Sequence, residues 1–480
     1  MATLIALVGC GKPPLVPEVP RGPALAQAGI VLACTTQTTD PTGAQVSYQF
    51  DWGDGTQSAW SAYITGGVAF ADTHTYANPA TYKVRARARN SKRASAWSAA
   101  LDLAVNPGEG GVRWRVAYTD PEDPEDSVDL SLNTFAVDEA RDAVYIGCEY
   151  GAVICRKLDG TRRWEFLNRE GDEFMAAPAI GPDGTVYISC WNDSLYALNS
   201  DGTRKWTVGL GDEVTAPVAL SSTGVLYCQT MGDSLFALNS TDGSRIWAHV
   251  SGGGNSAPAV GADGSVYVGG IDGLVEGLDP SNGSPKWSYF LGSGQIDASP
   301  AIDPAAGVLY VANSDGYVAA LGLADGNEQW KVQLGEGCAT PVVGADGRVF
   351  IGAGGKVQEL NKASGAVVWQ FAPLAGGGVV SSPALSSDGS IYVLATLGKR
   401  LDNPDPDSLY CVAADGTRRW ATALGEGLSD DVISAPKIDS EGNVYIGSGF
   451  CGWCVLGTSG AAQTAWPQFQ HDALNTGRAQ

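Results

Sequence analysis

The stretch from residue 177 to residue 206 decides the fold; it reads APAIGPDGTVYISCWNDSLYALNSDGTRKW. It divides into four short runs, APAI, TVYIS, SLYAL and TRKW, and the pairs Asp183-Gly184 and Asp201-Gly202 separate the first two runs and the last two. An Asp-Gly pair favours the positive φ angles of a tight hairpin, so the runs on either side should pair antiparallel. The stretch therefore predicts a unit of four short antiparallel strands.

Two aromatic series mark further copies of this unit. In the first series a tyrosine or phenylalanine recurs at intervals of 40 to 43 residues, with a last interval of 53: Tyr145, Tyr187, Tyr227, Tyr267, Tyr310, Phe350, Tyr392 and Tyr445. In the second series a tryptophan follows 19 or 20 residues later, and 28 in the last case: Trp164, Trp206, Trp247, Trp287, Trp330, Trp369 and Trp420. Repeats of this period are typical of propellers, in which a ring of blades leaves only short protected edges. We expect an all-β, eight-bladed β-propeller of four-stranded antiparallel blades. Seven is the rival count, because the seventh copy carries an insertion and the eighth is degenerate.

The closure of this ring has two candidate tryptophans. Arg113-Trp114-Arg115 resembles the fourth strand of a unit, yet no first three strands precede it. The simplest interpretation is that it completes the eighth blade, whose own strands begin at Pro436 and Tyr445. Trp466 in the tail is the alternative, and the sequence leaves both open.

The turn that precedes the second aromatic series carries the clearest motif. Residues 237–247 fit the pattern A-x-[DN]-x-x-x-G-x-x-x-W, and looser copies occur at residues 197–206, 279–287 and 361–369. Together with the tail segment WPQFQHD at residues 466–472, these repeats resemble the PQQ-binding-like superfamily, which includes the BamB-like assembly lipoproteins. The resemblance implies a scaffold that binds partners, and a BamB-like outer-membrane assembly factor is one version of it. A quinoprotein-type dehydrogenase that depends on PQQ and calcium is the enzymatic alternative. It is disfavoured because the chain has no adjacent cysteines and its blades are too short to roof a cofactor.

A separate module precedes the propeller. The hairpin YQFDWGDG at residues 48–55, followed by HTY at 74–76 and TYKV at 81–84, resembles the immunoglobulin-like PKD domain. The predicted organisation is therefore a signal and linker over residues 1–16, a PKD-like sandwich over 17–106 and the propeller over 107–480. Within the module, Asp40, Asp51 and Asp54 are candidates for a metal site, although turn chemistry alone explains Asp54-Gly55.

The first ten residues, MATLIALVGC, resemble the end of a lipoprotein signal with Cys10 as the acylated residue. The apolar run is too short to span a bilayer, which needs about twenty residues, and a basic segment before it is missing. A chance cysteine in an apolar terminus is the alternative. The lipoprotein interpretation predicts an exported outer-membrane protein, on the periplasmic or the cell-surface side, that meets the membrane only through Cys10.

Composition excludes several classes of function. The net charge is −22, with 30 basic residues against 52 acidic ones, which argues against nucleic-acid binding because phosphates demand a basic face. The three histidines, His74, His249 and His471, are explained by their repeat or family context, so no catalytic residues are expected. Cys451-Gly452-Trp453-Cys454 is the sharpest chemical motif, and its expected strand–turn–strand context favours a local disulfide or two free thiols over redox catalysis.

The acidic residues supply a binding hypothesis. In a four-stranded blade the turns between strands two and three, and the crossovers between blades, emerge on one side of the ring. The crossovers carry Asp172, Glu173, Asp212, Glu213, Asp297, Glu336, Asp430 and Asp431, while the hairpins carry Glu149, Asp193, Asp233, Asp272 and Asp315. Asp402, Asp405 and Asp407 of the seventh blade and the linker from Asp120 to Asp129 add to them. We expect one acidic face that attracts cations or basic partners. The alternative is that these residues only solubilise turns.

These observations together predict a non-enzymatic, exported binding or scaffold protein. Its propeller face would engage a protein or polysaccharide at the cell envelope or surface, and a basic partner would suit the acidic face. No cofactor is expected, and calcium held between neighbouring carboxylates is a subsidiary alternative.

Overall fold

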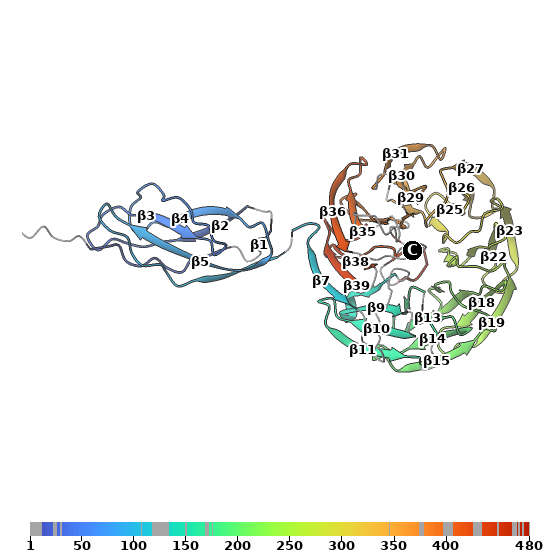
Figure 1. The fold of residues 1–480 in the computed structure, drawn as a ribbon. Helices are drawn as coiled ribbons and strands as arrows, with labels where there is room; N and C mark the ends of the chain where they lie inside the picture. Colours follow the sequence, from blue (N-terminus) through green and yellow to red (C-terminus); the bar gives the residue numbers. More distant parts are fainter. Residues whose placement is uncertain are drawn as a thin grey trace, which may run out of the picture. The chain divides into compact units, whose positions relative to one another are not determined.

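The structure is a computed structural model, which divides the chain into two compact units, Met1–Gly111 and Val112–Gln480 (Figure 1). It describes residues 12–22, 26–28, 31–106, 108–117, 134–148, 151–168, 172–174, 176–344, 346–373, 379–396, 407–425, 434–448, 451–462, 468, 471–472 and 475–479. Each unit is taken by itself below.

Unit 1 is a β-sandwich of two sheets. Its strands are β1 (Ala26–Gln27), β2 (Val31–Thr36), β3 (Ser47–Asp51), β4 (Phe70–Thr75), β5 (Ala80–Arg89) and β6 (Leu101–Asn106). One sheet has the order β1-β6-β5-β3 and the other pairs β2 with β4. Phe50 and Trp52 stack with their ring centres 5.0 Å apart in the core between the sheets, where alternate residues of β3 and β5 point inward. The predicted immunoglobulin-like sandwich is confirmed.

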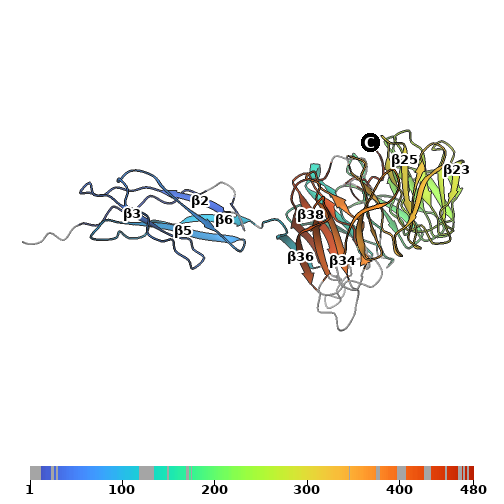
Figure 2. The same ribbon diagram turned by 90° about the horizontal axis from the view of Figure 1, so that it is seen from above.

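Unit 2 is a ring of small sheets (Figures 1 and 2). In its described part there are eight sheets, which we call blades and number in chain order. Blades 1 to 4 consist of β8 (Ala136–Asp138), β9 (Ala143–Cys148), β10 (Ala152–Arg156) and β11 (Arg162–Leu167); β12 (Ala179–Ile180), β13 (Val186–Cys190), β14 (Ser194–Leu198) and β15 (Arg204–Gly209); β16 (Ala219–Leu220), β17 (Val225–Gln229), β18 (Ser234–Asn239) and β19 (Arg245–Val250); and β20 (Ala259–Val260), β21 (Val266–Gly269), β22 (Leu274–Leu278) and β23 (Pro285–Phe290). A single 3-10 turn, η1 (Glu139–Arg141), joins β8 to β9 within the described residues.

Blades 5 to 8 complete the ring. They consist of β24 (Ala301–Asp303), β25 (Val308–Ala312), β26 (Tyr317–Gly322) and β27 (Glu328–Gln333); β28 (Val342–Val343), β29 (Val349–Ala353), β30 (Lys356–Leu360) and β31 (Val367–Phe371); β32 (Val379–Val380), β33 (Ala384–Leu385), β34 (Ile391–Thr396), β35 (Asp407–Val412) and β36 (Arg418–Gly425); and β37 (Lys437–Ile438), β38 (Asn443–Ser448), β39 (Cys451–Leu456) and β7 (Val112–Ala117). Blade 7 has the additional strand, because β32 and β33 both pair with β34. The predicted class, an all-β propeller of antiparallel blades, is confirmed.

The two aromatic series meet inside each blade. The tyrosine or phenylalanine of the second strand contacts the tryptophan of the fourth strand, with ring centres 5.7 to 6.0 Å apart in all eight blades. In most blades a small third-strand residue lies opposite the tryptophan, as Cys155 does opposite Trp164 and Ala197 opposite Trp206. Cys155, Cys411 and Cys454 therefore occupy the third-strand position that Ala197 holds in blade 2.

The ring closes with a strand from the beginning of unit 2. Strand β7 pairs with β39 as the outer strand of blade 8, and Trp114 lies opposite Cys454. Trp114 is therefore the tryptophan of the strand that closes the ring. The alternative, Trp466, lies outside the described residues. The indole N–H of Trp114 then donates to the carbonyl of Leu158 in blade 1, at 2.8 Å.

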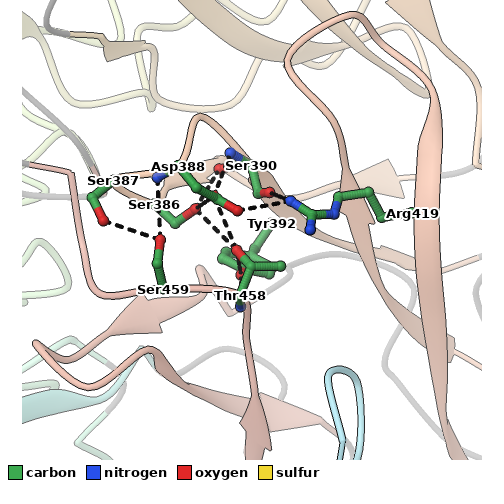
Figure 3. Close-up of polar contacts among 8 residues, drawn as sticks. All are labelled: Ser386, Ser387, Asp388, Ser390, Tyr392, Arg419, Thr458 and Ser459. Carbon is green, nitrogen blue, oxygen red and sulfur yellow. Dashed lines mark hydrogen bonds and ion pairs between the residues drawn. The ribbon is translucent and has the colours of Figure 1, made fainter. Parts of the chain in front are cut away.

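A polar cluster joins blades 7 and 8 where the chain leaves β39 (Figure 3). The carboxylate of Asp388 accepts from the hydroxyl of Thr458 at 3.0 Å and from the guanidinium of Arg419 at 2.7 Å. The Asp388 backbone N–H donates to the hydroxyl of Ser459 at 3.1 Å, and the Thr458 backbone N–H donates to the hydroxyl of Tyr392 at 2.6 Å. These bonds fix the segment that follows β39 onto the neighbouring blade.

The tail returns to the middle of the ring, where Figure 1 marks the C-terminus. Its carbonyls accept from first strands of successive blades: Leu220 donates to Thr476 and Val260 donates to Gly477, both at 2.8 Å. The side-chain amide of Asn475 donates to carbonyls of blades 1 and 2, those of Phe135 and Pro178. The tail thus ties the inner strands of several blades together.

Candidate protein interface

The crossovers and the second-to-third strand hairpins lie side by side on one side of the ring. In blade 2 the backbone N–H of Trp191, in the hairpin, donates to the carbonyl of Glu173, in the crossover that enters the same blade, at 3.1 Å. The same bond recurs in blades 3 to 6, from Met231 to Glu213, Ile271 to Gly253, Ser314 to Gln295 and Gly354 to Glu336, at 2.9 to 3.1 Å. The expected shared side of these two kinds of loop is therefore present in five consecutive blades.

We call the acidic residues of these loops the acidic rim. Its described members are Asp172, Glu173, Asp193, Asp212, Glu213, Asp233, Asp272, Asp297, Asp315 and Glu336. The backbone bonds above bring Glu173 beside the hairpin of Asp193, and Glu213 beside that of Asp233. Asp430, Asp431, Glu149, Asp402, Asp405 and the linker Asp120 to Asp129 lie outside the described residues. Asp407 begins β35, and its side chain is not described.

Among the described residues, no ion pair joins any rim carboxylate to a lysine, arginine or histidine. On the other side of the ring, where the first-to-second strand turns lie, carboxylates are paired at 2.7 to 4.0 Å: Asp138 with Arg141, Asp142 with Arg163, Asp183 with Lys205, Asp263 with Lys286, Asp346 with Arg348 and Asp388 with Arg419. Ion pairs among the described residues therefore compensate part of the charge on that side, where Asp159, Asp201, Asp242 and Asp279 of the third-to-fourth strand turns have none, and they compensate none of the charge of the rim.

Glycines hold several rim carboxylates close to the backbone. A Cβ placed on Gly232 would lie 1.6 Å from a carboxylate oxygen of Asp212, and one on Gly252 would lie 2.6 Å from the carboxylate of Asp272. Asp193 and Asp233 themselves adopt left-handed backbone, with φ of 61° and 72°. Aspartate tolerates this conformation better than most side chains, because it can hydrogen-bond locally. The loops thus fix where these charges stand, a feature that the spacing of acids in the sequence does not reveal.

Two rim carboxyls have raised pKa values. Desolvation, and then the neighbouring charge of Asp172, raise the pKa of Glu173. Desolvation also raises the pKa of Asp297, against a hydrogen bond with Asn255 that lowers it. A raised carboxyl pKa indicates that nothing positive nearby favours the charged form, which agrees with the missing ion pairs.

The candidate metal residues of unit 1 each have separate partners. Asp40 is buried and accepts from the amide of Asn90 at 2.7 Å, and these and other hydrogen bonds lower its pKa to about 2. Asp51 pairs with Arg85 at 2.6 Å, and Asp54 with His74 at 2.7 Å. No three Asp, Glu, His or Cys side chains in the described part of the chain converge on a metal position. Asp54 instead orients His74, whose ring stacks on Trp52.

The cysteine motif differs from its expected context. Cys451 and Cys454 lie on a single strand, β39, and not across a turn. The side chain of Cys451 is not described. Cys454 has a free buried thiol, and burial raises its pKa, the reverse of what a redox nucleophile needs. The predicted strand–turn–strand context is wrong, because the whole motif lies within the third strand of blade 8, where Cys454 pairs with Trp114.

Comparison with known proteins gives two family matches. The model described as outer membrane protein assembly factor BamB matches residues 156–313, 192–354 and 314–460, and the PKD domain matches residues 18–102. No curated protein sequence matches the chain closely enough to count as a relative.

Three solved structures resemble the ring. BamB from Moraxella catarrhalis is 19% identical with a TM-score of 0.55, over 67% of this chain and 95% of that one. The computationally designed Ika8 protein is 15% identical with a TM-score of 0.56, over 69% and 98%. The C-terminal WD40 domain of Sif2 is 11% identical with a TM-score of 0.55, over 69% and 99%. At these identities the likeness shows the propeller fold alone. Among the described residues no helix is long and apolar enough to cross a membrane.

Proposed function

Because the chain belongs to the family of the outer membrane protein assembly factor BamB, we propose that it is a non-enzymatic binding protein of the cell envelope. The family supports a binding or assembly role with protein partners. We further propose that the acidic rim is the docking surface and that the partner presents a basic surface to it.

The single observation behind this assignment is the uneven compensation of charge. Among the described residues, ion pairs with arginine or lysine compensate carboxylates of the first-to-second strand turns and none of those of the rim. A cluster of uncompensated charge destabilises the free protein by self-repulsion, while it speeds encounter with an oppositely charged partner. The unpaired acids of the third-to-fourth strand turns, on the opposite side, are the matched comparison.

The proposal also includes where the protein lies in the cell envelope. Acylation of Cys10 would fix the chain to the outer membrane, and unit 1 would act as a spacer between the lipid and the propeller. A spacer suits a protein that works at the cell surface better than one that docks directly on the periplasmic side. A polysaccharide partner and the BamB-like assembly role are the alternatives to a basic protein at the surface.

A pull-down from envelope extract with the full chain tests the rim. One variant carries D172N, E173Q, D212N and E213Q in the rim. The matched control carries D159N, D201N, D242N and D279N, in turns on the opposite side where asparagine can keep the hydrogen bonds that aspartate makes to the turn backbone. Both variants change the net charge from −22 to −18.

We expect the native chain and the control to recover the same partner and the rim variant to lose it, with recovery fading as salt screens the charges. Equal recovery by all three proteins at low and high salt would exclude the rim as the docking surface. Equal loss of the partner by both variants would mean that binding depends on the net charge of the protein and not on the rim.

A further inference from the structure

Unit 1 contains a repeated pentapeptide with a defined geometry. The sequence SAWSA occurs at residues 58–62 and again at residues 95–99. In the first copy the hydroxyls of Ser58 and Ser61 accept from backbone N–H groups of β3, both at 2.9 Å. In the second copy Ser95 and Ser98 accept from β5, both at 3.1 Å. Because β3 and β5 pair with each other, the two segments flank the same pair of strands.

Their tryptophans meet the arginines of β5 and form an alternating stack, which we call the Arg–Trp ladder. Arg87 lies with its guanidinium carbon 4.4 Å from the ring centre of Trp97 and 5.3 Å from that of Trp60. Arg89 lies 4.4 Å from Trp60 and 5.9 Å from Tyr63, and Arg85 lies 5.7 Å from Trp97. A guanidinium stacked on rings keeps its N–H edges available for hydrogen bonds.

The three arginines differ in how many of their side-chain N–H groups are already hydrogen-bonded. Arg85 pairs with Asp51, and Arg87 donates twice to the side-chain oxygen of Gln49, at 3.0 and 2.7 Å. The side chain of Arg89 makes no hydrogen bond or ion pair with any described residue, and its Nε is shielded from water without a partner. A held guanidinium with unsatisfied donors is costly unless something else accepts from it.

The charge around the ladder differs from that of the remaining chain. Residues 83–93 hold six basic side chains and no acidic one. Residues 12–106 carry a net +2 within a chain of −22, which leaves −24 for the rest. Arginines at every second position of a strand recur about every 7 Å, so they present a straight row of donors.

We propose that the Arg–Trp ladder is a binding strip for a linear acidic polysaccharide whose carboxylates or sulfates bind Arg89, Arg87 and Arg85 edge-on. Planar carboxylates match the fork of an arginine, and a narrow chain can follow one strand. This site is independent of the acidic rim.

Affinity electrophoresis of the full chain through gels that contain polygalacturonate tests the proposal, with neutral dextran gels as the blank. The R89Q variant removes the unpartnered guanidinium. The matched control K83Q removes one charge from the same strand outside the ladder, where Lys83 already pairs with Asp102 at 2.8 Å. R89K keeps the charge and loses the fork, and thermal unfolding of each variant reports the purely structural effect.

We expect polygalacturonate to retard the native chain and dextran not to, with retardation lost in high salt. R89Q should weaken the affinity about tenfold, R89K less, and K83Q by less than about twofold. The proposal would be overturned if R89Q and K83Q were retarded equally, or if the native chain were not retarded at all. The Arg–Trp ladder would then have only a structural role. Binding that depends on Arg89 but occurs only on phosphatidylglycerol vesicles would overturn it in favour of a lipid. Should R89Q fail to fold, the comparison of R89K with K83Q decides in the same way.

Discussion

The tryptophans of the fourth strands show how one residue joins two blades. Seven of them donate their indole N–H to a carbonyl in the third-to-fourth strand turn of the next blade, at 2.7 to 3.2 Å. Trp420, in blade 7, has a shielded indole N–H with no partner among the described residues. The reason lies in blade 8: its fourth strand, β7, comes from elsewhere in the chain, so no such turn follows β39 to supply the acceptor.

This difference predicts unequal costs for the same substitution. W330F removes the bond from Trp330 to the carbonyl of Lys362, at 2.7 Å, whereas W420F removes only an unsatisfied donor. Both lose similar ring volume, so W330F should lower the free energy of unfolding by about 1–2 kcal/mol more than W420F does. Urea titrations of both variants measure the difference. Equal costs would mean that the bond to the next blade contributes nothing net.

At the scale of elements, the third-to-fourth strand turn of each of blades 1 to 7 packs on the tryptophan of the blade before it. Its glycine has left-handed backbone and lies against the ring: a Cβ on Gly283, with φ of 73°, would lie 2.6 Å from Trp247. The glycine and the tryptophan of the A-x-[DN]-x-x-x-G-x-x-x-W pattern therefore serve two different contacts. The glycine packs against the tryptophan of the preceding blade, and the tryptophan donates a hydrogen bond to the following blade.

G283A should destabilise the ring more than an alanine in an equally left-handed but open position. Gly307 has φ of 69° and nothing within 4 Å of its would-be Cβ, so G307A carries the backbone strain alone. The extra clash in G283A should cost about 1–3 kcal/mol beyond that strain. Chemical denaturation of the two variants measures this difference in the free energy of unfolding. If both lose the same stability, the glycine is required only for its backbone angle.

The sequence predicted the elements that repeat and missed those that occur once. Period and turn chemistry located the strands and the side on which the rim loops lie. The tail is different, because Asn475 and Thr476 bind inner strands of other blades through single contacts that follow no period. The rim acids were visible in the sequence, but their lack of ion pairs was not, since pairing depends on which basic side chain lies opposite. The Arg–Trp ladder was missed for the same reason.

The whole ring is closed twice, at its outer edge by β7 and at its centre by the tail. At the centre, the fully buried Lys437 donates to the carbonyl of Asp472 at 2.8 Å. The tail aspartate in turn accepts from the backbone N–H of Thr476, at 2.9 Å. Burial raises the pKa of Asp472, but hydrogen bonds with His471 and Thr476 outweigh it and hold the pKa below its usual range. A lysine and a carboxylate thus lie together where the chain end is anchored.

Lys437 should make the stability of the ring depend on pH in the alkaline range. Burial lowers its pKa to about 7, against the charge of Asp472 that raises it, while the unfolded chain keeps an ordinary lysine with a pKa of 10.5. Between these values the unfolded chain binds a proton that the folded chain does not, so Lys437 contributes a rise of the free energy of unfolding with pH. Burial raises the pKa of thiols such as Cys155 and Cys228, which contribute a fall over the same range, so the part of Lys437 is the difference between the native chain and a variant without this lysine. Below pH 7 both states are protonated, and the cost of the buried ammonium is present in full.

K437M should therefore lose this contribution and stabilise the protein most at pH 7 and below, where the buried ammonium costs most. Urea titrations of the native chain and of K437M from pH 7.5 to 10 measure the difference in slope. K157M, at an exposed lysine, is the control and should keep the native slope. If K437M shows the same slope as the native chain, Lys437 is not the group that titrates. The tail is then held without a cost in stability from a buried charge.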